Sequence, residues 1–129
     1  NLRKALRLGA VLVGDRVVGV GAVKRLGAHH DTIERRSGFK DLDAFLAEIG
    51  YLCIHPSFRE KGLAGKLFES LLSECPGAVY ATTREDHEAM QHILKKNGFT
   101  RVGQPWDSRK SPGKKIHLWV GPRRDCPPE

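Results

Sequence analysis

Hydrophobic and polar positions alternate with two different periods along the chain, and each period predicts a different kind of element. Residues 11–13 and 16–23 are rich in valine and lie on either side of a Gly14-Asp15 pair. Two such runs joined by a short glycine-containing pair are typical of a β-hairpin. Residues 24–40 are mixed and polar and follow neither period, so we expect them to form a mobile connection.

The rest of the chain predicts strands that alternate with helices. Residues 49–54 are β-branched and aromatic and are closed by His55-Pro56, which favours a buried strand with a sharp exit. From Gly62 onward leucines recur every four residues, at Leu63, Leu67 and Leu71, as on one face of a helix that ends at Pro76-Gly77. The other expected elements are a short apolar piece capped by Asp41 with Leu42, Phe45 and Leu46, a strand at 78–83, a helix at 86–97 and strands at 99–103 and 116–120. This order predicts an α/β layer architecture.

Length and composition narrow the class of protein. With 129 residues the chain fits one domain, and 40% apolar residues is a normal share for a globular protein. No apolar run approaches the roughly 20 residues that a membrane helix needs, and the basic start lacks a signal-peptide pattern. The three cysteines (Cys53, Cys75 and Cys126) are odd in number and widely spaced. We therefore expect a soluble protein in the reducing cytoplasm.

The positive net charge of the chain favours anionic ligands or partners. The formal net charge is +7, and basic residues outnumber acidic ones by seven to three from residue 101 to the end. The basic ones are Arg101, Arg109, Lys110, Lys114, Lys115, Arg123 and Arg124, and the acidic ones are Asp107, Asp125 and Glu129. Such a cluster suits a nucleic-acid surface, but basic residues interleaved with Gly and Pro also suit a solvated loop.

The segment from residue 54 to residue 66 carries the candidate chemistry. A strand stops there, a short polar loop with two glycines follows, and a helix opens out of the loop. The first turn of a helix has free N–H groups and a positive dipole, so a glycine at that place lets a phosphate approach the main chain. The spacings of a Walker loop and of a Rossmann dinucleotide loop are both absent. The pattern therefore favours an anionic diphosphate of another kind.

This segment resembles the signature of the GNAT acyltransferase superfamily, [Q/R]-x-x-G-x-[G/A] between a strand and a helix. The signature is represented here by Arg59-Glu60-Lys61-Gly62-Leu63-Ala64. The strand that ends in Ile54-His55-Pro56 and the later helix that ends in Asn97-Gly98-Phe99 are similar to the family's elements, and the resemblance covers residues 11–120. It implies a single domain over 1–129, with a central mixed, mostly antiparallel β-sheet flanked by helices on both faces.

The resemblance also implies acetyl-CoA as cofactor. Its pyrophosphate would lie on the amides from Arg59 to Gly65, and its pantetheine arm would pair along the strand at Cys53 and Ile54. The implied cofactor-binding residues are Cys53, Ile54, Arg59, Lys61, Gly62, Leu63, Ala64, Gly65 and His87. His87 stands where many members have an asparagine that contacts the arm, although it could also be an exposed first-turn histidine. Between two apolar neighbours, Cys53 itself is expected to be a buried structural thiol.

Glu48 is the candidate general base. It resembles the glutamate of histone acetyltransferases in the superfamily, and a carboxylate between apolar neighbours can have its pKa raised towards neutrality. The alternative is an exposed glutamate at a strand end. Leu94 stands where many members have the tyrosine that protonates the leaving thiolate, so the acid is unassigned. No metal is expected, because His87 and His92 are five residues apart and His29-His30 has no ligand pattern around it.

The function that the resemblance implies is transfer of an acetyl group to a primary amine by direct attack. A non-catalytic acyl-CoA-binding module and a basic nucleic-acid-binding domain are the alternatives, with acetylation of an RNA-attached amine between them. The family has a strand and one or two helices before the hairpin, and only residues 1–8 stand in their place here. Such a short segment would fit a fragment, a domain-swapped dimer or a naturally short form. The acceptor is expected to be a small-molecule or peptide amine.

Overall fold

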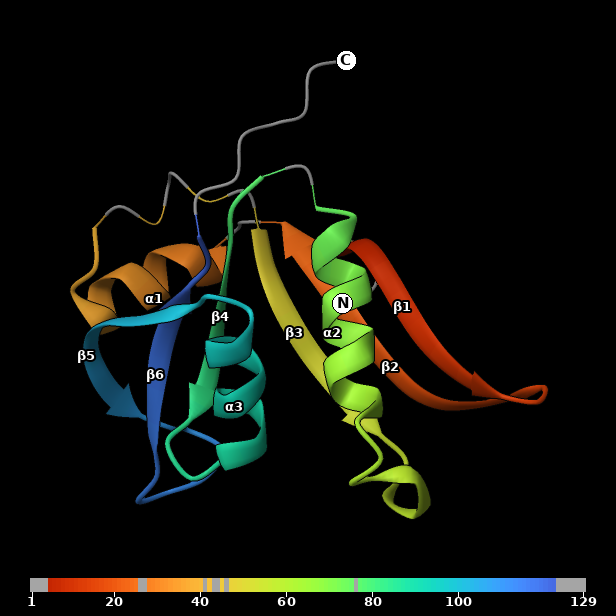
Figure 1. The fold of residues 1–129 in the computed structure, drawn as a ribbon. Helices are drawn as coiled ribbons and strands as arrows, with labels where there is room; N and C mark the ends of the chain where they lie inside the picture. Colours follow the sequence, from red (N-terminus) through yellow and green to blue (C-terminus); the bar gives the residue numbers. More distant parts are fainter. Residues whose placement is uncertain are drawn as a thin grey trace. The chain divides into compact units, whose positions relative to one another are not determined.

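The computed structural model describes residues 5–25, 28–40, 42, 45, 47–75 and 77–122. These residues form two compact units, one from Asn1–Arg25 and Glu48–Cys75 and the other from Leu26–Ala47 and Pro76–Glu129. Each unit combines strands with at least one helix (Figure 1).

The first unit is built on the predicted hairpin. Strands β1 (Ala5–Val13) and β2 (Arg16–Arg25) pair antiparallel around a turn in which Gly14 has a φ of +64°. Strand β3 (Ala47–Ile54) follows β2 in the sheet order, and a short 3₁₀ turn, η3 (Pro56–Phe58), leads towards helix α2 (Leu63–Ser73). The hairpin prediction is confirmed, and β1 begins six residues earlier than the valine-rich run.

Helix α2 lies against β1 and β2 at a pair of facing glycines. Gly9 and Gly21 are directly opposite each other, and a Cβ at Gly9 would come within 2.8 Å of the Cδ1 of Leu67. Leu67 and Leu71 of α2 are buried, at 4% and 2% exposure. The leucine period therefore faces the strands as expected, and the glycines make the close approach possible.

The second unit has an antiparallel sheet with helices on both faces. Strand β4 (Val79–Arg84) pairs with β6 (Lys115–Val120), which also pairs with β5 (Thr100–Asp107). Helix α1 (Ala28–Ser37) lies behind these strands and helix α3 (Glu88–Lys96) in front of them (Figure 1). The mostly antiparallel α/β architecture is thus confirmed. None of the described helices combines the length and the apolar character needed to cross a membrane.

Helix α1 corrects the prediction of a mobile connection over residues 24–40. Strand β2 continues to Arg25, and α1 begins at Ala28. The helix carries only one large apolar residue, Ile33, so its sequence shows no helical period. Ile33 is 1% exposed and packs with Leu42, Tyr80 and Leu118. Tertiary contacts, rather than a local pattern, therefore stabilise this helix.

The apolar piece after residue 41 joins the same core. Leu42 is fully buried, and Phe39 and Phe45 pack against its cluster with their ring centroids 6.3 Å apart. Asp41 and Leu46, the expected cap and the last apolar residue of this piece, lie outside the described residues.

Candidate functional site

The exit from β3 is a tight, well-connected turn. The backbone N–H of His55 donates to the carbonyl of Val18 at 2.7 Å, which ties the end of β3 to β2. The Nδ1 of His55 accepts from the N–H of Ser57, and the ring of Phe58 meets the His55 ring edge to face. Pro56 at the first position of this turn cannot continue a strand. The chain therefore leaves β3 in one defined direction, towards α2.

Arg59 is anchored to the strand that it follows. Its Nε donates to the carbonyl oxygen of Ile54 at 3.1 Å, which leaves the two terminal guanidinium nitrogens for other contacts. Glu60, the next residue, has a φ of +64°, a left-handed conformation that is uncommon for a non-glycine residue. A short loop that holds such a residue stores strain of about 1–3 kcal/mol, as functional loops often do.

The first turn of α2 is distinguished by its backbone N–H groups and by the space around Gly62. Gly62 is the N-cap with a φ of +74°, no side chain caps it, and the first backbone bond of the helix runs from the Lys66 N–H to the Gly62 carbonyl at 3.2 Å. Within the described parts of the chain, the N–H groups of Leu63, Ala64 and Gly65 have no partner. A Cβ at Gly62 would meet no atom within 4 Å. Unpaired amides at a helix N-terminus suit an anion.

Two cations accompany this turn. Lys61 and Arg59 are both exposed, and they lie one and three residues before Gly62 in the chain. They add positive charge to that of the helix dipole, whose effect is greatest in the first turn. The residue types and the backbone geometry therefore agree on a phosphate or diphosphate ligand.

Glu48 is buried at the start of β3. Its exposure is 6%, and its neighbours Ala47 and Ile49 are 0% and 1% exposed. The alternative of an exposed carboxylate at a strand end is therefore wrong. The role of Glu48 as general base stays a prediction.

The expectation that Cys53 is a buried structural thiol is also wrong, because Cys53 is exposed. Successive residues of a strand point to opposite faces, so its apolar neighbour Ile54 is buried at 8% exposure while Cys53 is not. The buried thiol of the described residues is Cys75, whose Sγ lies 3.2 Å from the carbonyl of Leu71. Cys126 lies outside the described residues.

His87 belongs to the second unit, whereas Glu48 and the other eight candidate cofactor residues belong to the first. It is the N-cap of α3, its side chain makes no capping bond, and it is exposed. The histidine ring is therefore open to a ligand. Leu94, on the same helix, is fully buried and belongs to the hydrophobic core.

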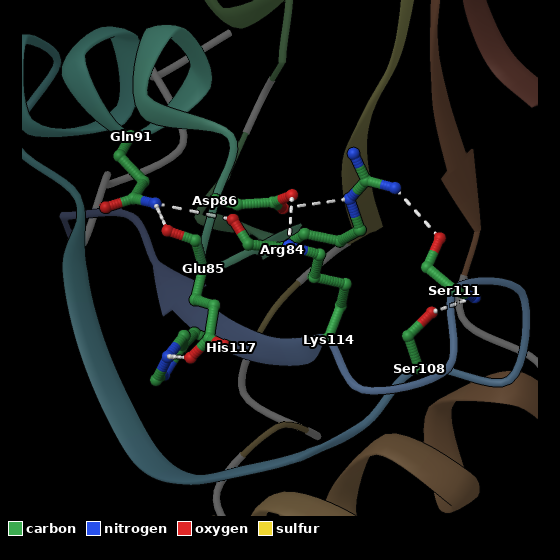
Figure 2. Close-up of polar contacts among 8 residues, drawn as sticks. All are labelled: Arg84, Glu85, Asp86, Gln91, Ser108, Ser111, Lys114 and His117. Carbon is green, nitrogen blue, oxygen red and sulfur yellow. Dashed lines mark hydrogen bonds and ion pairs between the residues drawn. The ribbon is translucent and has the colours of Figure 1, made fainter.

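The loop before α3 is held by contacts that the sequence did not predict (Figure 2). The Nε2 of Gln91 lies 2.7 Å from the Glu85 carbonyl and 3.3 Å from the Arg84 carbonyl, and the His87 N–H donates to the Arg84 carbonyl. The Nε of Arg84 lies 3.1 Å from Asp86 and the Nζ of Lys114 lies 3.4 Å from it. Desolvation acts to raise the pKa of Asp86, but Arg84 and Lys114 together lower it below its usual value. No spacing rule connects residues 84 and 114, so only the fold shows this network.

The metal prediction is untested. Among the residues that the structure describes, no three His, Cys, Asp or Glu side chains gather into a group that could hold an ion. His29 and His30 lie within α1 rather than in the loop that was expected there.

Comparisons with known proteins agree with this geometry. The mycothiol acetyltransferase of Streptosporangium roseum is 30% identical over 107 residues, which are 81% of this chain and 27% of that protein. The ribosomal-protein-alanine N-acetyltransferase of Brucella melitensis has a TM-score of 0.67 at 14% identity, over 89% of this chain and 67% of that one. A GNAT family acetyltransferase from Elizabethkingia anophelis, solved with acetyl-CoA bound, has a TM-score of 0.66 at 11% identity, over 93% and 77%.

The chain thus spans about a quarter of the length of its mycothiol relative. The two structural likenesses, both well under 25% identity, support the fold. The model of the acetyltransferase (GNAT) family matches residues 2–99, which is more than half of the chain and includes β3, the loop and α2. The chain therefore belongs to the GNAT acetyltransferase family.

Proposed function

We propose that this chain is a single N-acetyltransferase domain that transfers an acetyl group from acetyl-CoA to a primary amine by direct attack. The observation that carries the proposal is the first turn of α2, where three amides are unpaired and a Cβ at Gly62 would meet no atom within 4 Å. Membership of the GNAT family supports it, and so does the relative that was solved with acetyl-CoA bound.

The residues at the loop fit the proposed cofactor. The amides of Leu63, Ala64 and Gly65 would bind the pyrophosphate, and Arg59 and Lys61 would offset its charge. Cys53 and Ile54 would pair with the amide groups of the pantetheine arm through their backbone. The contact expected from His87, which belongs to the second unit, stays a prediction. Acetyl-CoA, when bound, supplies an acetyl group activated as a thioester.

Glu48 has the role of general base in this proposal. An amine is protonated at neutral pH and cannot attack until it loses a proton. Glu48 would take that proton directly or through one water. No covalent enzyme intermediate is needed, so the exposed Cys53 does not act as a nucleophile.

One observation favours a second candidate, a non-catalytic acyl-CoA-binding module. Leu94 is fully buried and carries no proton that it could give to a leaving thiolate. Such a module would bind the cofactor through the same loop without turnover. We also place the protein in the cytoplasm, where its exposed Cys53 thiol would stay reduced.

Cofactor binding is tested first. Acetyl-CoA should raise the free energy of unfolding by RT ln(1 + [L]/Kd), and with it the melting temperature, because the ligand binds the folded state. It should also slow alkylation of the exposed Cys53 by about tenfold or more, as judged by peptide mass spectrometry. The buried Cys75 is the internal control, since it should react slowly with or without the cofactor.

Turnover is tested second, by release of free CoA thiol over a panel of amines. Thiol release that depends on an amine supports the enzyme. Stabilisation by acetyl-CoA without release from any amine would support the binding module instead. Neither stabilisation nor protection of Cys53 would overturn the cofactor assignment itself.

A further inference from the structure

The loop between β3 and α2 is tied back to the strand that it leaves. The Nε–H of Arg59 donates to the Ile54 carbonyl at 3.1 Å, and the backbone N–H of Arg59 lies 3.4 Å from the Pro56 carbonyl that accepts from it. The bond to Ile54 is partly buried, although Arg59 as a residue is exposed. The end of β3 is itself held, because the N–H of His55 donates to the Val18 carbonyl of β2. Arg59 is therefore bonded to a fixed point of the sheet.

The residues after Arg59 need such support. Glu60 has a φ of +64° and Gly62 a φ of +74°, so two left-handed conformations fall within three residues. For Glu60 this conformation costs free energy, and it persists only where surrounding contacts hold it. The N–H groups of Glu60, Lys61 and Gly62 have no partner among the residues that the structure describes. These loop amides belong to no strand or helix, so the bonds of Arg59 take over the part of positioning them.

We propose that Arg59 is a positioning residue, whose Nε–H bond to the Ile54 carbonyl holds the loop amides in place for the pyrophosphate. The inference rests on the proposed function, since it concerns the same cofactor site, and it assigns to Arg59 a part that is separate from its charge. A loop that is already held need not be ordered on association, so the bond lowers the free-energy cost of binding. The Ile54 carbonyl stays open to the pantetheine arm, because a carbonyl oxygen accepts two hydrogen bonds.

The place of the donor along the side chain separates the bond from the charge. Arginine and glutamine both carry an N–H nitrogen on Cδ, and they are the two residues that the GNAT signature allows at this position. Methionine is about as long as glutamine but has no donor. Arg59→Gln therefore removes the charge and keeps the bond, whereas Arg59→Met removes both.

Acetyl-CoA affinity is measured by calorimetry in the full chain. Arg59→Gln should raise the Kd by about threefold, as expected for one exposed charge contact, and Arg59→Met by about 30-fold, because the loss of a hydrogen bond adds a factor of about ten. In turnover assays the Met variant should show the same rise in the KM for acetyl-CoA, with kcat at saturating cofactor within about twofold of the parent. Equal Kd values for Arg59→Gln and Arg59→Met would overturn the proposal.

Lys61 provides the matched control. It is an exposed cation of the same loop, and it has no hydrogen bond or ion pair with any residue in the described ranges. Lys61→Gln and Lys61→Met should therefore bind acetyl-CoA with Kd values within about twofold of each other. A Gln-to-Met difference as large as that at Arg59 would assign the effect to methionine itself and overturn the proposal.

Stability without cofactor distinguishes positioning from a general structural role. The melting temperature of all four variants should stay within about 3 °C of the parent, because exposed loop residues contribute little to the free energy of unfolding. A larger fall in Arg59→Met alone would make Arg59 a residue of general stability and overturn its assignment as a positioning residue.

The bond also has a readout that needs no ligand. In proton–nitrogen correlation spectra, the Nε–H signal of Arg59 is identified by its loss in Arg59→Gln. We expect this Nε–H to exchange with water about tenfold or more slowly than that of Arg16, an exposed arginine of the hairpin, with and without acetyl-CoA. Equal exchange rates would overturn the proposal. Failure of the parent chain to bind acetyl-CoA would instead refute the cofactor site, whereas unchanged affinity of Arg59→Met in a chain that binds would refute only the part given to Arg59.

Discussion

Glu48 is one residue whose burial the flanking sequence left open, and its burial leads to a sharp prediction. Glu48→Gln keeps the size and the hydrogen-bonding capacity but cannot accept a proton. We expect kcat to fall by about 10²–10⁴-fold with unchanged acetyl-CoA affinity, and the acidic limb of the pH–rate profile to disappear. At high pH, where solvent deprotonates the amine, variant and parent should converge. Glu69→Gln, on the exposed part of α2, is the control. A Glu48→Gln enzyme with the parental profile would exclude Glu48 as the base.

Gly62 should matter for the cofactor rather than for the fold. A Cβ there has open space, so Gly62→Val would place methyl groups in front of the free amides and hold a pyrophosphate away from them. The left-handed backbone adds strain of about 1–2 kcal/mol. Gly14→Val carries the same kind of strain at a φ of +64°, also in open space, and is the matched control. Calorimetry should show that only Gly62→Val loses acetyl-CoA binding. Unchanged acetyl-CoA affinity in a folded Gly62→Val variant would show that the pyrophosphate binds elsewhere.

Trp119 carries the buried side-chain atom that lacks a partner in the described part of the chain. The residue is 4% exposed, and its Nε1–H makes no hydrogen bond. Trp119→Phe removes this unsatisfied donor, which should return about 1–3 kcal/mol and offset the loss of packing from the smaller ring. We expect the free energy of unfolding from urea titration to change by no more than about 1 kcal/mol. A loss well beyond that would mean that the indole N–H is bonded in solution.

Helix α2 depends on glycines in the strands beneath it. A Cβ at Gly21 would lie 2.5 Å from the Cδ2 of Leu52 and 3.0 Å from the Cδ1 of Leu71, so Gly21→Val would push the helix outwards. We expect a loss of about 1–3 kcal/mol of stability, as for other overpacked cores. Ala10→Val adds two methyl groups to the same hairpin at an exposed position and should be close to neutral. Equal effects of the two changes in thermal unfolding would contradict the packing argument.

At the same scale, α1 shows why an element can escape detection. A helix is recognised in a sequence by repeated apolar positions, and α1 offers Ile33 alone. Its remaining stability comes from contacts with β5 and β6, which include the Gln104 side chain donating to the Arg36 carbonyl at 3.3 Å. These partners are about seventy positions away in the sequence, where no local pattern can point to them.

The stability of the whole molecule should depend on the protonation of His117. Burial lowers its pKa first, the charge of Arg101 lowers it further, and Glu85 at 4.0 Å partly opposes both. Because the folded state binds the proton less readily than the unfolded chain, stability is fully present above about pH 6.5 and is lost as the pH falls towards the lowered pKa. In the His117→Gln variant, the melting temperature should change less with pH over this window than in the parent.

The exposed carboxylates of Asp86 and Asp107 do not contribute to the loss of stability over this pH window. The pKa values of Asp86 and Asp107 are lowered below 3.8, so the stabilisation from their ion pairs is lost only in more acidic solution. A His117→Gln variant that keeps the parental slope between about pH 6.5 and pH 5 would show that the histidine is not responsible.

The sequence by itself determined what depends on neighbouring residues: the hairpin around Gly14-Asp15, the leucine period of α2, and the strand, loop and glycine that mark the GNAT family. These signals are local, because turn chemistry, helical period and helix capping involve residues within a few positions of each other. Only the tertiary structure decided the exposure of Cys53, the burial of Glu48, helix α1 and the ion pair between Asp86 and Lys114. Each of these depends on which face a residue presents to a distant segment, and chain topology rather than local pattern sets that face.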